Sequence, residues 1–357
     1  MMDQDTELKV ILTRIVTKSG FTLDQSKKIF KKIIENDTSD FFKASILVGL
    51  SIRGESINEI HSLIQVINEN SIKISPKIRG SLIDTCGTGG DKIKTFNIST
   101  AAAIVASAAG CKIAKHGNRS SSGMYGSADF LEYIGLDLTK SPDSISKIIG
   151  KIGLGFLFAP IFHPALKSLS KIRRNIGIRT IFNIAAPLCN PCTNLTGQVI
   201  GVYDLALLKK LTEVTKKIDK RFMIVYSEKG FDEITNTGLN SIVYLHDGKV
   251  SNLNLNPKDV DIPITSIEKI SINNKEESVK LTLQSIYGTA KKEIEDIVVL
   301  NSAAALVVSN IARNFKEGIE ISRTVIKEEK ARKKLENFID LSGNIKKLRE
   351  VEKDVFN

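Results

Sequence analysis

Three glycines and five hydroxyl residues are crowded into residues 84–100, DTCGTGGDKIKTFNIST, between two apolar runs. Gly87, Gly89 and Gly90 allow backbone N–H groups to approach an anion closely, and the N-terminus of a following helix would point to the same place. A strand-to-helix turn with one hydroxyl as helix cap is the structural alternative, but it accounts for only one of the glycines. No Gly-Lys-Ser/Thr follows Gly87 as in a Walker A loop, and Lys92 occupies the position of the third glycine of a dinucleotide fingerprint. The pattern therefore predicts a different phosphate site. Its side-chain donors would be Thr95, Asn97, Ser99 and Thr100.

A second polar cluster, KHGNRSSSG at 115–123, follows the next expected strand, and GSAD at 126–129 comes after it. Loops at the carboxyl ends of parallel strands meet at one edge of an α/β sheet, where ligands bind. We therefore expect both loops to face one ligand. The structural alternative is a mobile polar loop with Ser127 as a helix cap, and the concentration of basic and amide side chains at 115–119 argues against it.

Paired carboxylates, Asp232 and Glu233, follow the expected strand Phe222–Tyr226 within GFDE. Beside two phosphate loops they would supply the hard oxygen ligands that Mg²⁺ shares with phosphate. An adjacent Asp-Glu pair is common, so a charged turn is the alternative.

A basic segment begins with HPALK at 163–167 and continues through Arg173 to RTIFN at 179–183. The guanidinium of Arg173 offers a planar fork for a carboxylate. From spacing alone, a solvated basic helix over 164–175 is equally compatible with this pattern.

Composition limits the class of protein. The 357 residues are 42% hydrophobic and 25% charged, as in soluble globular proteins, and no apolar run reaches membrane-spanning length. The acidic, helix-like N-terminus is unlike a secretory signal, so we expect a cytoplasmic protein. The net charge of +11 is concentrated in two patches without acids, at 92–119 and 163–179. Such patches suit a compact polyanion better than a nucleic acid.

Cys189 and Cys192 form a CxxC motif that could suggest zinc or redox chemistry. No second pair of ligands stands at zinc-knuckle spacing, and the prolines around the motif indicate a loop instead of a helix start. We therefore interpret these cysteines as inert.

Two kinds of element would position the site residues. Short amphipathic helices are expected over the first seventy residues, with capping boxes at Thr22–Gln25 and Ser56–Glu59. From Leu82, short apolar strands alternate with helices, which predicts an α/β domain with a mainly parallel sheet flanked by helices. A β-hairpin is expected at 241–255, and two long helices, 291–315 and 319–341, are expected near the end of the chain.

Together these motifs resemble those of the anthranilate phosphoribosyltransferases, which join anthranilate to phosphoribosyl pyrophosphate in tryptophan biosynthesis. GTGGD, TFNIST, KHGNR, GSAD, HPAxK, RxxxGxRTIFN, PLxNP and GxDE occur in that order over residues 87–233. Individually some of these motifs are weak, whereas the ordered set is specific.

The resemblance implies a role for each matching residue, and also Mg²⁺, two ions per subunit. The metal would be held by Ser99, Asp232 and Glu233, and anthranilate by Gly87, Asn118, His163 and Arg173. No residue is assigned as a general acid or base, and His116 is considered only as an orienter. Phosphoribosyl pyrophosphate would be surrounded by Gly87, Gly90, Asp91, Thr95, Asn97, Ile98, Ser99, Thr100, Lys115, His116, Gly117, Asn118, Arg119, Ser120, Ser121, Ser122, Gly123 and Ser127.

The resemblance also implies a small helical domain at 1–78 with a return segment at 164–197. The large α/β domain would then comprise 79–163 and 198–357, and a homodimer would form through the helical domain. Two departures from the family pattern stand out. Ala185–Ala186 replace the usual Leu-Gly, which affects the anthranilate side, and Gly123 replaces a serine in the phosphate loop.

Two other functions are also to be weighed against the sequence. A pyrimidine nucleoside phosphorylase has a related fold but should lack HPAxK and RTIFN. A nucleic-acid-binding relative without activity would suit the positive charge but has no need for Asp232 and Glu233.

Overall fold

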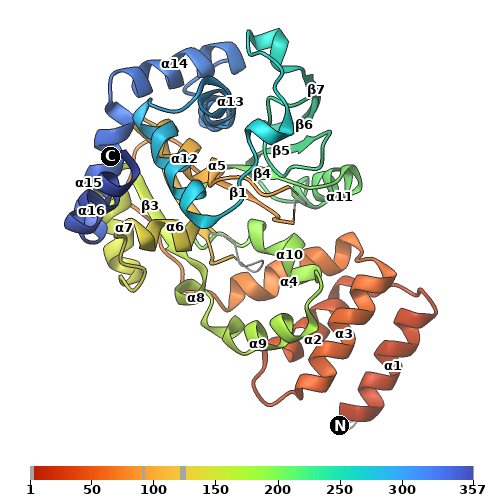
Figure 1. Ribbon diagram of the computed structural model, residues 1–357. Helices are drawn as coiled ribbons and strands as arrows, with labels where there is room; N and C mark the ends of the chain where they lie inside the picture. Colours follow the sequence, from red (N-terminus) through yellow and green to blue (C-terminus); the bar gives the residue numbers. More distant parts are fainter. Residues whose placement is uncertain (1–3, 91–92, 121–125, 357) are drawn as a thin grey trace. The chain divides into compact units, whose positions relative to one another are not determined.

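The computed structural model describes residues 4–90, 93–120 and 126–356, which form two compact units (Figure 1). The smaller unit comprises Met1–Ile72 and Pro160–Pro191, and the larger unit comprises Lys73–Ala159 and Cys192–Asn357. These bounds differ from the expected ones at 73–78, 160–163 and 192–197.

Hydrogen bonds of the main chain and of Asn194 accompany the different bounds. Ile74 forms a β-bridge with Cys192, and the side chain of Asn194 donates to the Pro76 carbonyl at 2.9 Å, so both segments belong to the larger unit. The Ile72 N–H donates to the Phe162 carbonyl at 2.8 Å, which ties 160–163 to the smaller unit.

The smaller unit is helical, as expected. Both predicted capping boxes are confirmed, at the starts of the second and fourth helices. A buried ion pair between Arg53 and Glu59 links the end of the third helix to the cap of the fourth. The helices are α1 (Gln4–Val16), α2 (Leu23–Ile34), α3 (Asp40–Arg53), α4 (Ile57–Glu69), α9 (Lys167–Ile176) and α10 (Ile181–Ala185), with short turns α8 (Ala159–Phe162), η1 (Pro164–Leu166) and η2 (Ala186–Leu188) around the return segment.

The larger unit is built on a seven-stranded sheet in the order β3-β2-β1-β4-β5-β6-β7. The first five strands in this order are parallel, and β6 and β7 extend the sheet as the expected antiparallel hairpin. The predicted mainly parallel sheet is therefore confirmed. The strands are β1 (Leu82–Gly87), β2 (Lys112–Gly117), β3 (Leu154–Phe158), β4 (Gly197–Gly201), β5 (Arg221–Ser227), β6 (Asn240–His246) and β7 (Lys249–Leu255).

Alanine-rich helices bring the covering layer close to the sheet. Helix α5 carries Ala101, Ala102 and Ala103, and α13 carries a similar run, so the two helices pack against each other and against β1. Both runs are almost completely buried. The helices of this unit are α5 (Ile98–Ala108), α6 (Ser127–Tyr133), α7 (Pro142–Ile152), α11 (Leu205–Thr215), α12 (Lys275–Tyr287), α13 (Lys292–Val308), α14 (Phe315–Lys327), α15 (Lys330–Ser342) and α16 (Ile345–Phe356).

The prediction of two long helices near the end of the chain is wrong, since four helices stand there (Figure 1). Helix α14 starts at a new cap, where Asn314 Oδ1 accepts the Glu317 N–H at 3.0 Å. Glu329, with φ of 56°, separates α14 from α15. Neither break contains glycine or proline, the residues that most often mark the end of a helix in a sequence. Among the described residues, no helix is long and apolar enough to cross a membrane.

Candidate active site

The predicted phosphate loops lie at the carboxyl edge of the sheet. The chain runs from β1 outward to β2 and β3, then returns to place β4 on the other side of β1. This reversal makes the ends of β1 and β4 a topological switch point, where α/β proteins bind ligands. Loops that follow β1, β2 and β5 meet there within the larger unit.

Two strand ends lack side chains because Asp232 occupies the space. A Cβ at Gly87, the last residue of β1, would lie 2.1 Å from Asp232 Oδ2. A Cβ at Gly201, the last residue of β4, would lie 1.3 Å from the Asp232 carbonyl oxygen. Glycine is therefore required at both positions for the backbone after β5 to reach this edge.

The glycine loop is held to the same aspartate. The Gly89 N–H donates to Asp232 Oδ2 at 2.7 Å, and the Thr88 N–H donates to the Gly201 carbonyl at 2.9 Å. Gly89 and Gly90 have φ of 67° and 95°, a region that disfavours side chains. Asp91, expected to contact phosphoribosyl pyrophosphate, lies outside the described residues, as does Lys92.

Helix α5 starts beside this loop. Asn97 is its N-cap residue, but its side chain does not cap the helix, so the turn with Ser99 or Thr100 as cap is not what forms. The Asn97 N–H instead donates to Thr282 Oγ1 at 3.2 Å. Thr95 pairs with Ser271 in an isolated bridge, and Ile98 is fully buried.

Two hydroxyls of this region lack partners among the described residues. Thr88 Oγ1 and Thr100 Oγ1 are both buried without a hydrogen bond there. A buried hydroxyl without a partner is unfavourable, which favours a ligand-binding role for this region over a purely structural one.

Lys115 on β2 is the buried cation of the site. Its Nζ donates to the Thr85 carbonyl at 2.6 Å and to Ser99 Oγ at 3.2 Å. Burial lowers the pKa of Lys115, while the nearby charges of Asp84, Glu233 and Asp232 act in the opposite direction. The lysine therefore links the start of α5 electrostatically to the carboxylate pair.

Asp84 was not predicted as a site residue, yet it anchors this arrangement. It is fully buried on β1, and its Oδ1 accepts the His116 N–H at 3.1 Å. Its Oδ2 accepts from Gln198 Nε2 at 3.2 Å. The position of Asp84 in β1, directly after the apolar residues Leu82 and Ile83, was the available sequence signal.

The loop after β2 is closed by Asp129. Its Oδ2 accepts the N–H groups of Ser120 at 2.8 Å and Gly126 at 2.9 Å. Ser127, the helix cap in the structural alternative, is the first residue of α6 after the N-cap Gly126, and its hydroxyl donates to the Asn118 carbonyl at 3.5 Å. A Cβ at Gly117 would lie 2.4 Å from Ser127 Oγ. Ser121, Ser122 and Gly123 lie outside the described residues.

Arg119, expected to bind phosphate, is already paired with carboxylates. Its guanidinium donates to Glu132 at 2.6 and 2.9 Å and to Asp129 at 3.2 Å. This bidentate contact lowers the pKa of Glu132. In this conformation Arg119 braces the loop onto α6.

Asp232 and Glu233 fit Mg²⁺ as a partial ligand set. The described residues contain no group of three His, Cys, Asp or Glu side chains that could hold a metal alone. Protein Mg²⁺ is commonly bound by one or two carboxylates together with substrate phosphates and waters. The buried Asp232 carboxylate, held at the glycine loop, meets that requirement, and Ser99 supplies a hydroxyl near the same edge.

His163 and Arg173 belong to the smaller unit. Arg173 on α9 is half-buried, donates to Asn183 Oδ1 at 3.3 Å and lies over the ring of Phe182. Burial lowers the pKa of Arg173, and none of the described carboxylates forms an ion pair with it. His163 is buried in the turn before η1.

The cysteines of the CxxC motif are buried. Cys189 donates to the Ala185 carbonyl at 3.2 Å, and burial raises the pKa of Cys192 to about 12. The Cys192 thiol therefore stays protonated at neutral pH, where it is a poor nucleophile.

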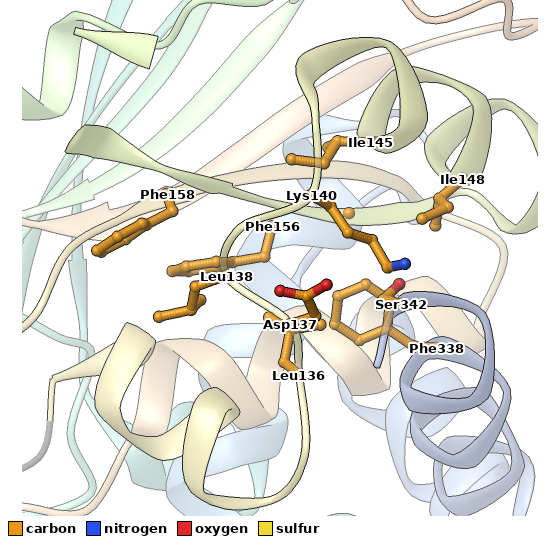
Figure 2. A pocket seen from close by; sticks show the side chains of 11 residues that line it. Leu136, Asp137, Leu138, Lys140, Ile145, Ile148, Phe156, Phe158, Phe338 and Ser342 are labelled. Atoms are coloured by element: carbon orange, nitrogen blue, oxygen red, sulfur yellow. The ribbon is translucent and has the colours of Figure 1, made fainter. Parts of the chain in front are cut away.

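An apolar cavity lies elsewhere in the larger unit, between β3, α7 and α15 (Figure 2). Phe156, Phe158 and Phe338 line it, with Asp137 and Lys140 at its side. Its volume of about 10 Å³ holds one water molecule at most, so it is not a substrate site.

Comparison with known proteins matches this architecture. Residues 79–332 match the glycosyl transferase family, a/b domain. Anthranilate phosphoribosyltransferase of Nitrosopumilus maritimus is 38% identical over 96% of this chain and 98% of its own length. The enzyme of that name from Clostridium beijerinckii is 39% identical over 92% of this chain and 97% of its own.

Solved structures agree. The crystal structure of anthranilate phosphoribosyltransferase from Thermus thermophilus is 31% identical, with a TM-score of 0.85 over 93% of this chain and 98% of that one. The Saccharomyces cerevisiae enzyme in complex with phosphoribosyl pyrophosphate and Mg is 24% identical, with a TM-score of 0.81 over 94% of this chain and 98% of that one, a likeness of fold. The chain belongs to the anthranilate phosphoribosyltransferase family of glycosyl transferases.

Proposed function

We propose that the protein transfers the phosphoribosyl group of phosphoribosyl pyrophosphate to the amine of anthranilate. The products are N-(5-phosphoribosyl)anthranilate and pyrophosphate, in a step of tryptophan biosynthesis. The observation that carries this proposal is the convergence of three groups at the switch point of the sheet. The first is the glycine loop, whose Gly89 N–H donates to Asp232. The second is Lys115, whose ammonium donates to Ser99, and the third is the loop after β2, which Asp129 closes.

The carboxyl edge of the sheet would bind the pyrophosphate end of the donor. Backbone N–H groups of 87–90, the hydroxyls at the start of α5, and the loop from Lys115 to Ser127 would surround it, including the residues that the structure does not describe. The buried ammonium of Lys115 would neutralise phosphate charge in a site of low dielectric, where such an interaction is stronger than in water.

The reaction breaks the bond between C1 of the ribose and pyrophosphate oxygen, and forms a bond from C1 to the anthranilate nitrogen. Positive character develops on the ribose and negative charge on the departing pyrophosphate. Donors fixed before the reaction stabilise this charge without reorganisation. The attacking aromatic amine is neutral and afterwards loses a proton to solvent, so the mechanism demands no strong base, and His116 would act only as an orienter.

Mg²⁺ would be held by Asp232, Glu233 and Ser99, with two ions per subunit. When bound, Mg²⁺ neutralises charge on the phosphates and assists pyrophosphate departure. The two carboxylates supply the fixed ligands, and the hydrogen bond from Gly89 orients Asp232.

Arg173 would bind the carboxylate of anthranilate, assisted by Asn118, Gly87 and His163. A partly buried guanidinium without an ion-pair partner among the described residues favours an incoming anion, because that anion would offset its desolvation. The bound carboxylate would fix the amine for attack on C1.

The decisive assay follows the loss of anthranilate fluorescence in the presence of phosphoribosyl pyrophosphate and Mg²⁺. We expect Arg173→Ala to raise the KM for anthranilate roughly 10- to 100-fold, as for the loss of hydrogen bonds to a charged group, and to leave the KM of the donor unchanged. Arg174→Ala, an exposed neighbour on α9, is the matched control and should change neither value.

If a folded sample shows no turnover either with or without Mg²⁺, the proposal is contradicted. Phosphorolysis of a pyrimidine nucleoside would favour the phosphorylase instead. A DNA mobility shift that weakens with salt would favour the nucleic-acid-binding relative. The full-length relatives and the presence of both HPALK and RTIFN favour the transferase over these two functions.

The proposal extends to cellular setting and assembly. Both substrates are small charged metabolites, which supports a cytoplasmic enzyme. A homodimer would form through the smaller, helical unit, which exposes several large apolar side chains.

A further inference from the structure

Two buried asparagines hold the main chain immediately after Asp232 and Glu233. Asn301 on α13 accepts the Ile234 N–H at 3.1 Å and donates to the Ile234 carbonyl at 2.7 Å. Asn240, at the start of β6, accepts the Thr235 N–H at 2.8 Å and donates to the Thr235 carbonyl at 2.9 Å. Two consecutive residues, Ile234 and Thr235, therefore each have both their N–H and their carbonyl hydrogen-bonded to an asparagine side chain.

A side-chain amide is the group that can do this. It offers one acceptor and two donor hydrogens, which match the N–H and carbonyl of a peptide unit. The segment after Glu233 belongs to no strand or helix, yet Ile234 and Thr235 are completely buried. Their main-chain groups need partners away from water, and the two amides provide them.

A polar side chain is unexpected at position 301 of α13. Asn301 is 6% exposed within the apolar run of α13, between Leu300 and Ser302. Its second donor hydrogen binds the Ile297 carbonyl of its own helix at 2.8 Å, which fixes the direction of the amide. An apolar side chain would suit this position better if packing were its only role.

On the other side of Asp232 and Glu233, close packing leaves no room for the backbone to shift. Asp232 lies against Gly201 and Gly87, where even a Cβ would collide with it. Two fixed strand ends thus bound the segment on one side, and the asparagine clamps hold it from α13 and β6. A small shift of Ile234 would carry the adjacent carboxylates with it.

We infer that Asn301 is a positioning residue for the metal-binding pair Asp232–Glu233, acting through the main chain of Ile234, with Asn240 in support. The inference rests on the proposed function for the role of the pair. The Asn301 amide is bonded to the main chain of Ile234 and Ile297, so its effect would reach the site through the peptide units it holds.

The test compares Asn301→Leu and Asn301→Asp with Ser302→Ala. Leucine has a similar size without hydrogen bonds, and aspartate keeps an acceptor but loses both donors. Ser302 is the matched control, because it is buried on the same helix and its hydroxyl accepts a hydrogen bond from Ser322 at 3.0 Å. Mn²⁺ binding in the presence of phosphoribosyl pyrophosphate is measured by electron paramagnetic resonance, alongside the thermal midpoint and steady-state kinetics.

We expect both Asn301 variants to weaken Mn²⁺ binding at least 10-fold and to raise the Mg²⁺ concentration needed for half-maximal activity by a similar factor. The KM for anthranilate should stay within 2-fold, and Ser302→Ala should leave Mn²⁺ binding unchanged. Unchanged Mn²⁺ affinity in a folded Asn301 variant would overturn the inference, and if the leucine variant does not fold, the aspartate variant decides. If Mn²⁺ binding by the protein depends on Asn301 but the wild type shows no turnover, the proposed function alone would be refuted.

Discussion

At the scale of single residues, the site depends on charges kept away from water. Lys115 is 4% exposed, and its ammonium donates to two neutral oxygens, the Thr85 carbonyl and the Ser99 hydroxyl. A cation in such a place favours an anionic ligand, because phosphate oxygens would restore the charge compensation that burial removes.

This burial predicts an alkaline limit for donor binding. Since the pKa of Lys115 lies below its ordinary value of 10.5, the free enzyme should lose this proton before an ordinary lysine does. The kcat/KM for phosphoribosyl pyrophosphate should therefore fall at a pH below 10.5. In the same window folding stability should rise with pH, because the unfolded chain binds the proton that the folded chain has lost.

Lys115→Met tests the assignment. The KM for phosphoribosyl pyrophosphate should rise roughly 10- to 100-fold, and the alkaline fall should disappear from the pH profile. An alkaline limb that persists in this variant would assign the titration to another group.

At the scale of elements, glycines and one carboxylate shape the loops. Asp129 on α6 binds the N–H groups of Ser120 and Gly126, so a single side chain closes the loop after β2. Its charge also lies beside Arg119, which Glu132 holds more strongly with two hydrogen bonds.

Asp129→Ala should therefore open this loop. Amide exchange at Ser120 and Gly126 should accelerate, and the KM for phosphoribosyl pyrophosphate should rise roughly 10-fold, because the donors are no longer fixed in place. Glu132→Gln is the control, since it weakens the Arg119 contact and leaves the loop closure intact. A lower donor KM in Glu132→Gln would mean that Arg119, once released, binds phosphate directly.

The sequence predicts helices and strands where the local signals, apolar periodicity and helix caps, are strong. Periodicity and capping boxes locate α2 and α4, and the alternation from Leu82 predicts the parallel sheet. The split of the closing helices was missed because Asn310 and Glu329 adopt positive φ without glycine. Asn301 was missed because its partner, Ile234, is 67 residues away in sequence and the contact exists only in the folded chain.

At the scale of the whole molecule, the charge of +11 favours the proposed reaction without requiring a nucleic acid. A net positive charge raises the local concentration of a polyanionic donor and its rate of encounter. That attraction is screened by salt, whereas the buried contacts of Lys115 are screened much less.

The proposed homodimer makes a prediction at this scale. The C-terminal ends of α1 and α3 lie together, since Arg53 of α3 donates to the Ser19 carbonyl just after α1 at 3.3 Å. Val16 and Ile52 stand at these ends and are each 80% exposed. Large exposed apolar side chains at adjoining helix ends are candidates for an interaction surface.

Replacing both Val16 and Ile52 with aspartate should therefore convert a dimer to a monomer, because two like charges would be buried at the interface without partners. Light scattering after size-exclusion chromatography measures the mass directly, and the thermal midpoint of the variant should lose its dependence on protein concentration. Leu205→Asp, at a 45% exposed position of the larger unit, is the control and should keep the dimer mass. A dimer that survives the double substitution would move the interface away from the ends of α1 and α3, and a monomeric wild type would remove the dimer from the proposal altogether.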